Sequence, residues 1–379
     1  MRGRSVRRSI RLSIRLSIRA ALSLLLAALA AATGTAAAQQ RQGGAAAGRD
    51  DLHVLPIRGN VSMIVGGGGY VTVSAGIDGI FMVDGGSAAT AARILAAVSE
   101  IGSRAVGAPG RMTTCVGPAC HEAGGLGPFL PFGWAGPSYN AVIASPRAPK
   151  PIRWIVETTL DVDHTGAVAA LATAGTTYNG GEAGRLIGER TTATVVAHEN
   201  ILKRMTIEKR PEGAWPTETY YTPTYKMSQY INGEGIQVYH APAAITDGDS
   251  FVYFRFSDVL AAGDLFTPGR YPAIQVGKGG SVQGVIAGLN AMIDIAFPEY
   301  RHQGGTMIVP GHGRLGDTAD LAIYRNMIVV VRDRIQDLVK QGMTLAQVRA
   351  ARPTMDFDGI YGAPDAFIEA VYRGVSGKQ

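Results

Sequence analysis

The segment at residues 161–166 (DVDHTG) limits most strongly what this chain can fold into. It follows an apolar run at residues 151–156 that is typical of a buried strand. A carboxylate and an imidazole next to each other, after a strand and before a helix, are suited to holding a divalent metal. The segment therefore predicts a sheet that carries a metal site at one edge.

Two further segments have the same organisation. Residues 262–266 (AGDLF) follow the apolar pair at 259–260, and residues 310–313 (PGHG) follow the apolar run at 307–309. Each ends a strand-like run with a glycine turn and one potential ligand. Three strand ends thus offer two carboxylates and two imidazoles, from Asp163, His164, Asp264 and His312.

These segments resemble those of the metallo-β-lactamase superfamily of hydrolases, whose first motif is His-x-His-x-Asp-His-x-Gly after a strand. Residues 159–166 (TLDVDHTG) match it, with Thr159 and Asp161 at the positions of the first two histidines. The resemblance covers about residues 52–320 and includes the Asp-Gly-Gly at 84–86. It implies an α/β fold, the four-layer αββα sandwich of this superfamily.

The resemblance implies two metal sites, of which this chain keeps one. The family's first site uses three imidazoles, and the matching positions here hold Thr159, Asp161 and Ile245. All four ligands of the second site are present. The resemblance therefore implies one ion, expected to be zinc, although two oxygens and two nitrogens also suit iron or manganese.

Asp161 and Asp163 are the expected catalytic residues, and the role of Asp161 stays open. It is a weak ligand in the altered first site, a general base toward the attacking water, or a carboxylate that orients a ligand imidazole. Thr159 is expected to be a hydrogen-bonding turn residue. His198 is expected to be structural, with an approach to the depleted first site as the alternative.

The first 38 residues have the pattern of a secretory signal peptide. Residues 1–19 carry seven arginines and no acid, residues 20–32 are apolar, and small residues precede Gln39. About 13 apolar residues are few for a membrane span. We therefore expect cleavage without a lasting membrane anchor, and an uncleaved anchor is the alternative. Removing seven arginines takes the formal net charge from +6 to about −1. We thus expect a periplasmic or secreted protein without a nucleic-acid partner.

Two Gly-rich stretches flank the first strands. Residues 39–51 predict a flexible lead-in, and residues 102–150 predict an insertion beside the metal. The insertion contains Cys115 and Cys120. In an exported chain this pair predicts a disulfide, and a zinc knuckle or a widened haem-attachment motif is the alternative.

The remaining pattern predicts one mixed α/β domain at 52–316, followed by C-terminal helices at 317–379 that pack on it. Strands are expected at 53–57, 61–65, 70–73, 80–83, 236–239, 251–254, 259–260 and 306–309. Helices are expected at 87–101, where Ser87 is a candidate N-cap, at 280–296, and at 366–372. Glycines 66–69 predict a hairpin turn. From Asp317 the chain is expected to be helical, with an apolar stripe of Ile323, Met327, Val330, Val331 and Ile335.

These features predict a secreted metal-dependent hydrolase of a small ester, thioester, lactone or lactam. The alternative is a metal-binding or inactive relative that keeps the fold in order to bind a ligand. Aromatic residues at 215–230 are expected either to line a substrate pocket or to pack on the core. The expected partner is a small molecule, and the sequence does not predict the oligomeric state.

Overall fold

The structure is a computed structural model that describes residues 52–105, 150–177, 192–227, 230–298 and 304–377. The expected signal peptide, the lead-in, most of the insertion and both cysteines lie outside these ranges. Within them, no helix is both long enough and apolar enough to cross a membrane.

The first sheet has seven strands in sequential order. They are β1 (His53–Arg58), β2 (Val61–Val65), β3 (Val71–Gly76), β4 (Gly79–Val83), β5 (Ile152–Val156), β6 (Thr194–His198) and β7 (Glu218–Tyr220). Neighbours from β1 to β4 are antiparallel, whereas those from β4 to β7 are parallel. The carboxyl ends of β4, β5 and β6 therefore meet at one edge of this sheet.

The second sheet has five strands in the order β12-β11-β10-β9-β8. They are β8 (Thr224–Lys226), β9 (Ile236–His240), β10 (Ser250–Phe254), β11 (Val259–Ala261) and β12 (Met307–Val309). β11 and β12 are parallel, while the other neighbours are antiparallel. The carboxyl ends of β11 and β12 thus also share an edge.

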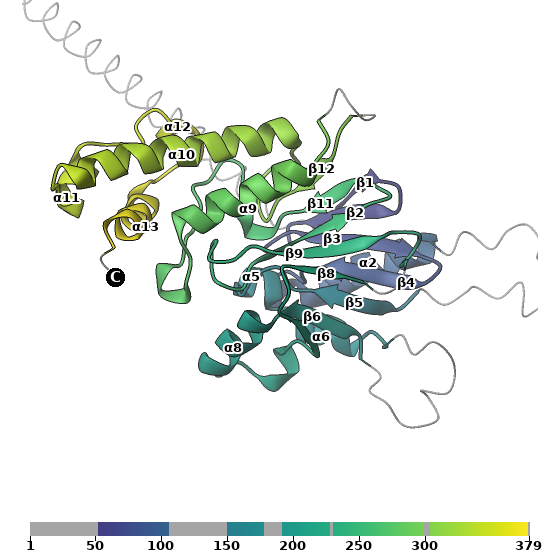
Figure 1. Cartoon of the computed structure of the whole chain (residues 1–379). Coiled ribbons are helices and arrows are strands. Elements are labelled where there is room, and N and C mark those ends of the chain that lie inside the picture. Colours follow the sequence, from purple (N-terminus) through teal and green to yellow (C-terminus); the bar gives the residue numbers. More distant parts are fainter. Residues whose placement is uncertain (1–51, 106–149, 178–191, 228–229, 299–303, 378–379) are drawn as a thin grey trace, which may run out of the picture. The chain divides into compact units, whose positions relative to one another are not determined.

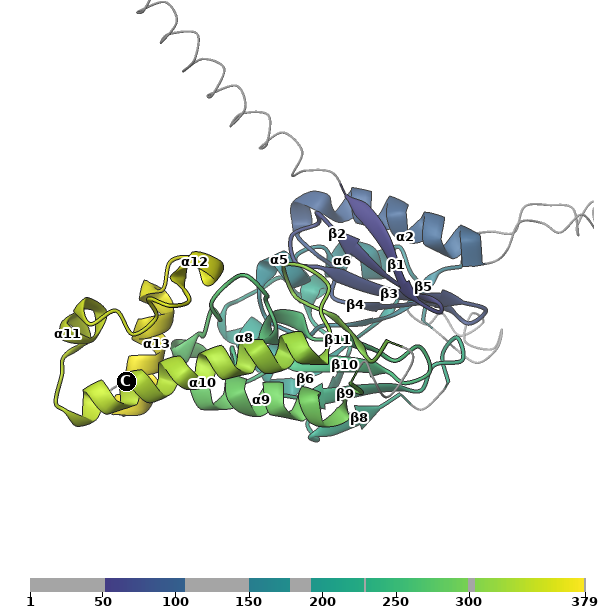
Figure 2. The same ribbon diagram turned by 90° about the horizontal axis from the view of Figure 1, so that it is seen from above.

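The two sheets pack face to face through a buried apolar layer. Phe81 of β4 and Phe254 of β10 meet edge-to-face in it, with ring centroids 5.8 Å apart. α2 (Ala91–Ala105) and α6 (Val168–Thr173) cover the outer face of the first sheet, and α9 (Val282–Ile295) and α10 (Thr318–Lys340) cover the second (Figures 1 and 2). Helix, sheet, sheet and helix form the expected four layers.

Shorter helices complete the described chain. They are α5 (Val162–Thr165), α8 (Glu199–Ile207), α11 (Leu345–Ala350), α12 (Asp358–Tyr361), α13 (Asp365–Ser376), and the 3₁₀ turns η1 (Ala88–Thr90), η4 (Glu212–Ala214), η5 (Gly263–Leu265) and η6 (Val276–Lys278). α13 packs on α9 and α10, beyond the end of the sheets (Figure 2).

The structure differs from the sequence-based expectation at some elements. β6, β7 and β8 were not predicted, and the helical region expected from Asp317 is divided into α10, α11, α12 and α13. In α10, Ile323 is 62% exposed and Val330 is 38% exposed. The buried stripe instead runs through Leu321, Tyr324, Met327, Ile328, Val331 and Ile335. Ser87 precedes a 3₁₀ turn, and its side chain caps no backbone N–H.

Candidate metal centre

The four candidate ligands come from three chain segments that end at the same edge. Five residues separate β5 from α5, which carries Asp163 and His164. η5 follows β11 and carries Asp264, and the turn after β12 carries His312. One ligand atom from each residue can be chosen so that all four lie within 4.8 Å of one another. No other group of three or more potential metal ligands occurs in the described part of the chain.

The contacts among these side chains outline a space for one small cation. Nε2 of His312 lies 2.8 Å from Oδ2 of Asp163 and 3.8 Å from Oδ1 of Asp264. Nε2 of His164 lies 3.1 Å from the same Oδ1 of Asp264. His164 is fully buried, while the other three side chains are partly exposed, so the centre opens toward solvent on one side.

Two glycines let backbone approach the ligands closely. The N–H of Gly69, at the end of the glycine turn between β2 and β3, donates to the carbonyl of Asp163 at 2.8 Å. A Cβ at Gly69 would overlap the Nε2 of His164, and one at Gly311 would overlap Oδ1 of Asp264. The turn expected at 66–69 is therefore also a wall of the metal centre.

Asp84 fixes the orientation of His164. Oδ2 of Asp84 lies 2.9 Å from Nδ1 of His164, and Thr158 donates to Asp84 from its N–H (2.8 Å) and from its hydroxyl (2.7 Å). A carboxylate on Nδ1 keeps the proton on that nitrogen and leaves Nε2 for a metal. In the sequence, Asp84 stands out only as the first residue of an Asp-Gly-Gly segment after a strand, and that position is its local signal.

Charge at the centre favours a cation. Burial alone would lower the pKa of His164, but Asp264 and Asp84 together raise this pKa well above its ordinary value. The hydrogen bond from His312 lowers the pKa of Asp163. The two carboxylates therefore favour the protonated form of His164 when no metal is bound, and metal binding competes with that proton.

The three positions of the expected depleted site make contacts of their own. Both oxygens of Asp161 accept from Nε2 of Gln275, at 2.7 and 2.9 Å. Ile245 is buried among apolar side chains beneath α9. Thr159 is 1% exposed, and its hydroxyl has no hydrogen-bond partner among the described residues. In this geometry Asp161 contacts an amide, whereas Asp84 contacts the ligand imidazole.

His198 belongs to a stacked aromatic cluster. Its ring lies parallel to that of His240, with centroids 3.6 Å apart, and edge-to-face with the buried Tyr220 at 5.2 Å. Tyr220 also stacks on Tyr225, and Trp215 packs on a small cluster next to α8. These rings of the 215–230 stretch pack on the core, while Tyr221 is 76% exposed.

Glu157, directly after β5, is a buried carboxyl group that no sequence motif marks. The side chain is fully buried, and neither of its oxygens has a hydrogen-bond partner among the described residues. Burial raises its pKa well above the ordinary value, nearby Asp84 raises it further, and Arg210 acts in the opposite direction. Burial thus favours the protonated, uncharged form of Glu157.

No protein-family model matches the sequence, and no curated protein matches it. Among solved structures, the stereoselective inverting sec-alkylsulfatase Pisa1 from Pseudomonas sp. is similar, with a TM-score of 0.57 and 14% identity. The match covers 86% of this chain and 51% of that one, so the chain spans about half the length of the alkylsulfatase. A metallo-β-lactamase from Pontibacter korlensis matches with a TM-score of 0.44 and 14% identity, over 74% of this chain and 99% of that one. The chain has the metallo-β-lactamase fold.

Proposed function

We propose that this protein is a secreted hydrolase that uses one metal ion, bound at Asp163, His164, Asp264 and His312. The convergence of these four donors carries the proposal. Two nitrogens and two oxygens suit zinc, and the lack of a side chain at Gly69 and Gly311 leaves room for the ligand atoms of His164 and Asp264. A divalent metal there would lower the pKa of a water ligand and polarise the bond to be cleaved.

Other residues of the chain would orient a ligand, accept a proton and contact the substrate. Asp84 holds the His164 ring so that Nε2 faces the centre. Asp161 is placed by Gln275 and would accept the proton of the attacking water. Val162, between the two aspartates, is 66% exposed and offers an apolar contact to a substrate at the mouth of the centre.

The substrate class in this proposal is a small ester, thioester, lactone or lactam. A fold does not determine a substrate. Because the similar Pisa1 is a sec-alkylsulfatase, an alkyl sulfate ester belongs in the same test. The second candidate function is a metal-binding protein without turnover. It is favoured by the loss of the first-site imidazoles, which leaves the two oxygens of Asp161 bound to an amide.

Metal analysis and a substrate panel separate these two functions. We would measure the metal content of the purified mature protein and its turnover of chromogenic esters, thioesters, lactones, lactams and a sec-alkyl sulfate. Native protein, Asp163→Ala and His312→Ala would be compared, with exposed Asp337→Ala and His53→Ala as matched controls.

One metal per chain, with turnover lost in both centre variants and kept in both controls, is the result expected for the hydrolase. Bound metal without turnover of any substrate supports the binding protein instead. Protein that binds no metal under any loading condition contradicts both functions.

A further inference from the structure

A second candidate site lies on the outer face of the five-stranded sheet. A cavity of about 480 Å³ opens there, lined by Lys226, Gln237, Tyr253, Arg255, Ile295 and Phe297. A smaller hollow of about 110 Å³ shares Lys226, Gln237 and Arg255 and adds Met227, Tyr230, Gly235 and Ile236. The three shared polar residues thus have apolar walls on both sides.

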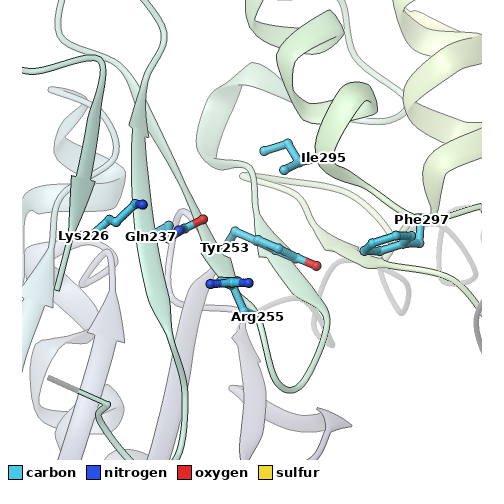
Figure 3. Close-up of a pocket in the computed structure, with 6 residues that line it drawn as sticks. All are labelled: Lys226, Gln237, Tyr253, Arg255, Ile295 and Phe297. Carbon is cyan, nitrogen blue, oxygen red and sulfur yellow. The ribbon is translucent and has the colours of Figure 1, made fainter. Parts of the chain in front are cut away.

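Strand register brings these residues together. Lys226 on β8 pairs with Gln237 on β9, which pairs with Tyr253 on β10. Directly paired residues point to the same face of a sheet, and so do residues two positions apart on one strand, such as Tyr253 and Arg255. Figure 3 shows the three side chains in a row across the strands, with Arg255 next to Tyr253. α9 ends at Ile295 and leaves this part of the face open.

The polar groups at this site are hydrogen-bond donors. Lys226 and Arg255 form no ion pair among the described residues. The Oε1 of Gln237 accepts from the hydroxyl of Tyr239 at 2.6 Å, which leaves its NH₂ group available as a donor. No acidic residue lines either hollow. The adjacent Glu234 is buried, and its carboxylate accepts from the N–H groups of Phe256 (2.9 Å) and Ser257 (3.2 Å).

The walls of the site are apolar. Tyr253 is largely buried, and its hydroxyl donates to Asp258 at 2.9 Å, so this residue adds ring surface rather than a free donor. Phe297 is 48% exposed and Tyr230 is 76% exposed. Aromatic surface beside unpaired cations is suited to a ligand that has one anionic group and an apolar body.

The site is separate from the metal centre. β10 starts at Ser250, whose N–H donates to the carbonyl of Thr158 close to the metal-binding edge. Arg255 lies five residues further on, which is about 17 Å along an extended strand. We propose that this pocket binds a small organic anion, a carboxylate, sulfonate or sulfate with an aromatic or alkyl body. Lys226, Gln237 and Arg255 hold the charged group, and Tyr253, Ile295 and Phe297 contact the body.

Titration with 8-anilinonaphthalene-1-sulfonate tests this proposal, because this aromatic sulfonate fluoresces when it is shielded from water. The Lys226→Gln/Arg255→Gln variant should bind it about tenfold more weakly than native protein, since two charge-assisted contacts are lost. Lys340→Gln/Arg373→Gln removes the same charge from exposed pairs elsewhere and should bind within about twofold of native. The charge-conserving Lys226→Arg/Arg255→Lys variant should keep most of the affinity.

A neutral probe and the metal-centre variants complete the test. N-phenyl-1-naphthylamine has the same rings without the sulfonate, and it should bind weakly and equally to native and double-variant protein. Equal binding of the two probes to native protein would overturn the anion site and leave only an apolar surface. Unchanged sulfonate affinity in Lys226→Gln/Arg255→Gln overturns it as well. So does loss of sulfonate binding in Asp163→Ala with normal circular dichroism, because the probe would then lie at the metal centre.

Discussion

At the metal centre, the backbone of residue 69 lies too close to a ligand for any side chain to fit. A Cβ added to Gly69 would overlap Nε2 of His164, the atom expected to bind the metal. The backbone of Gly69 does not require a positive φ, so the obstacle is the imidazole and not the conformation of the chain. Changes at this position therefore probe the centre without altering a ligand.

We predict that Gly69→Ala lowers zinc affinity by about tenfold or more, because the methyl group has to displace a ligand ring that Asp84 holds in place. Competition with a chromogenic chelator measures this affinity. Gly213→Ala is the matched control, since a Cβ there meets no atom within 4 Å. Equal zinc affinity in both variants would show that the ligand geometry differs from that described.

Glu157 gives a prediction about stability and pH. Burial raises its pKa above the ordinary value of 4.5, so the folded chain keeps this proton at pH values where the unfolded chain has released it. The stabilisation is complete below about pH 4.5 and is lost as pH rises through the folded-state pKa. We predict that Glu157→Gln, which cannot ionise, removes this decrease in stability with rising pH.

The free energy of unfolding in urea, measured at pH 5 and pH 8, checks the Glu157 prediction. The difference between the two pH values should be smaller in Glu157→Gln than in native protein. Exposed Glu212→Gln controls for the loss of a carboxylate and should retain the native difference. An identical pH response in all three proteins would mean that Glu157 ionises as easily in the folded chain as in the unfolded chain.

At the scale of elements, His198 connects a strand to a helix. It is the last residue of β6 and the N-cap of α8, where its Nδ1 accepts from the N–H of Asn200 at 3.3 Å. Only a neutral imidazole can accept at this nitrogen. Burial, and then the neighbouring His240, lower the pKa of His198 to about 4. The cap is therefore intact at neutral pH and fails in acid.

We predict that this cap contributes to the acid sensitivity of the fold. The folded-state pKa is depressed, so the stabilisation is complete above pH 6.5 and is lost as pH falls toward about 4. His198→Asn keeps an N-cap acceptor that does not titrate. The variant should lose less stability than native protein between pH 6.5 and 4, as measured by urea unfolding. Exposed His53→Asn should behave like native protein, and the same behaviour in His198→Asn would refute the assignment.

The elements that sequence predicted have strong local patterns. β1 to β5 are short apolar runs separated by turns, and α2 and α9 are long enough to show helical periodicity. β7 and β8 have three residues each, and they become strands because β6 and β9 offer edges to pair with. In α10 the apolar positions at 323 and 330 follow helical spacing, but the packing of α9 and α13 selects the neighbouring stripe through Tyr324 and Ile328.

At the scale of the whole molecule, the candidate ligands could be named from sequence because each lies in a short motif after a strand. The residues that hydrogen-bond to these ligands or to Asp161 could not be predicted in this way. Asp84 is 80 residues from His164, and Asp161 is 114 residues from Gln275. Nothing local marks either pair. The pairing of β4 with β5 brings Asp84 to His164, and the packing of the two halves of the fold brings Gln275 to Asp161.

The same convergence couples the metal to the stability of the fold, because the donors come from both sheets and meet only in the folded chain. Zinc at 100 times its dissociation constant should add about 2.7 kcal/mol to the free energy of unfolding. We predict a rise in Tm of roughly 5 °C for native protein, measured by calorimetry with and without a chelator. Asp163→Ala/His312→Ala should show no such rise, whereas Asp337→Ala/His53→Ala should match native protein. An equal rise in the centre variant would place the stabilising ion elsewhere.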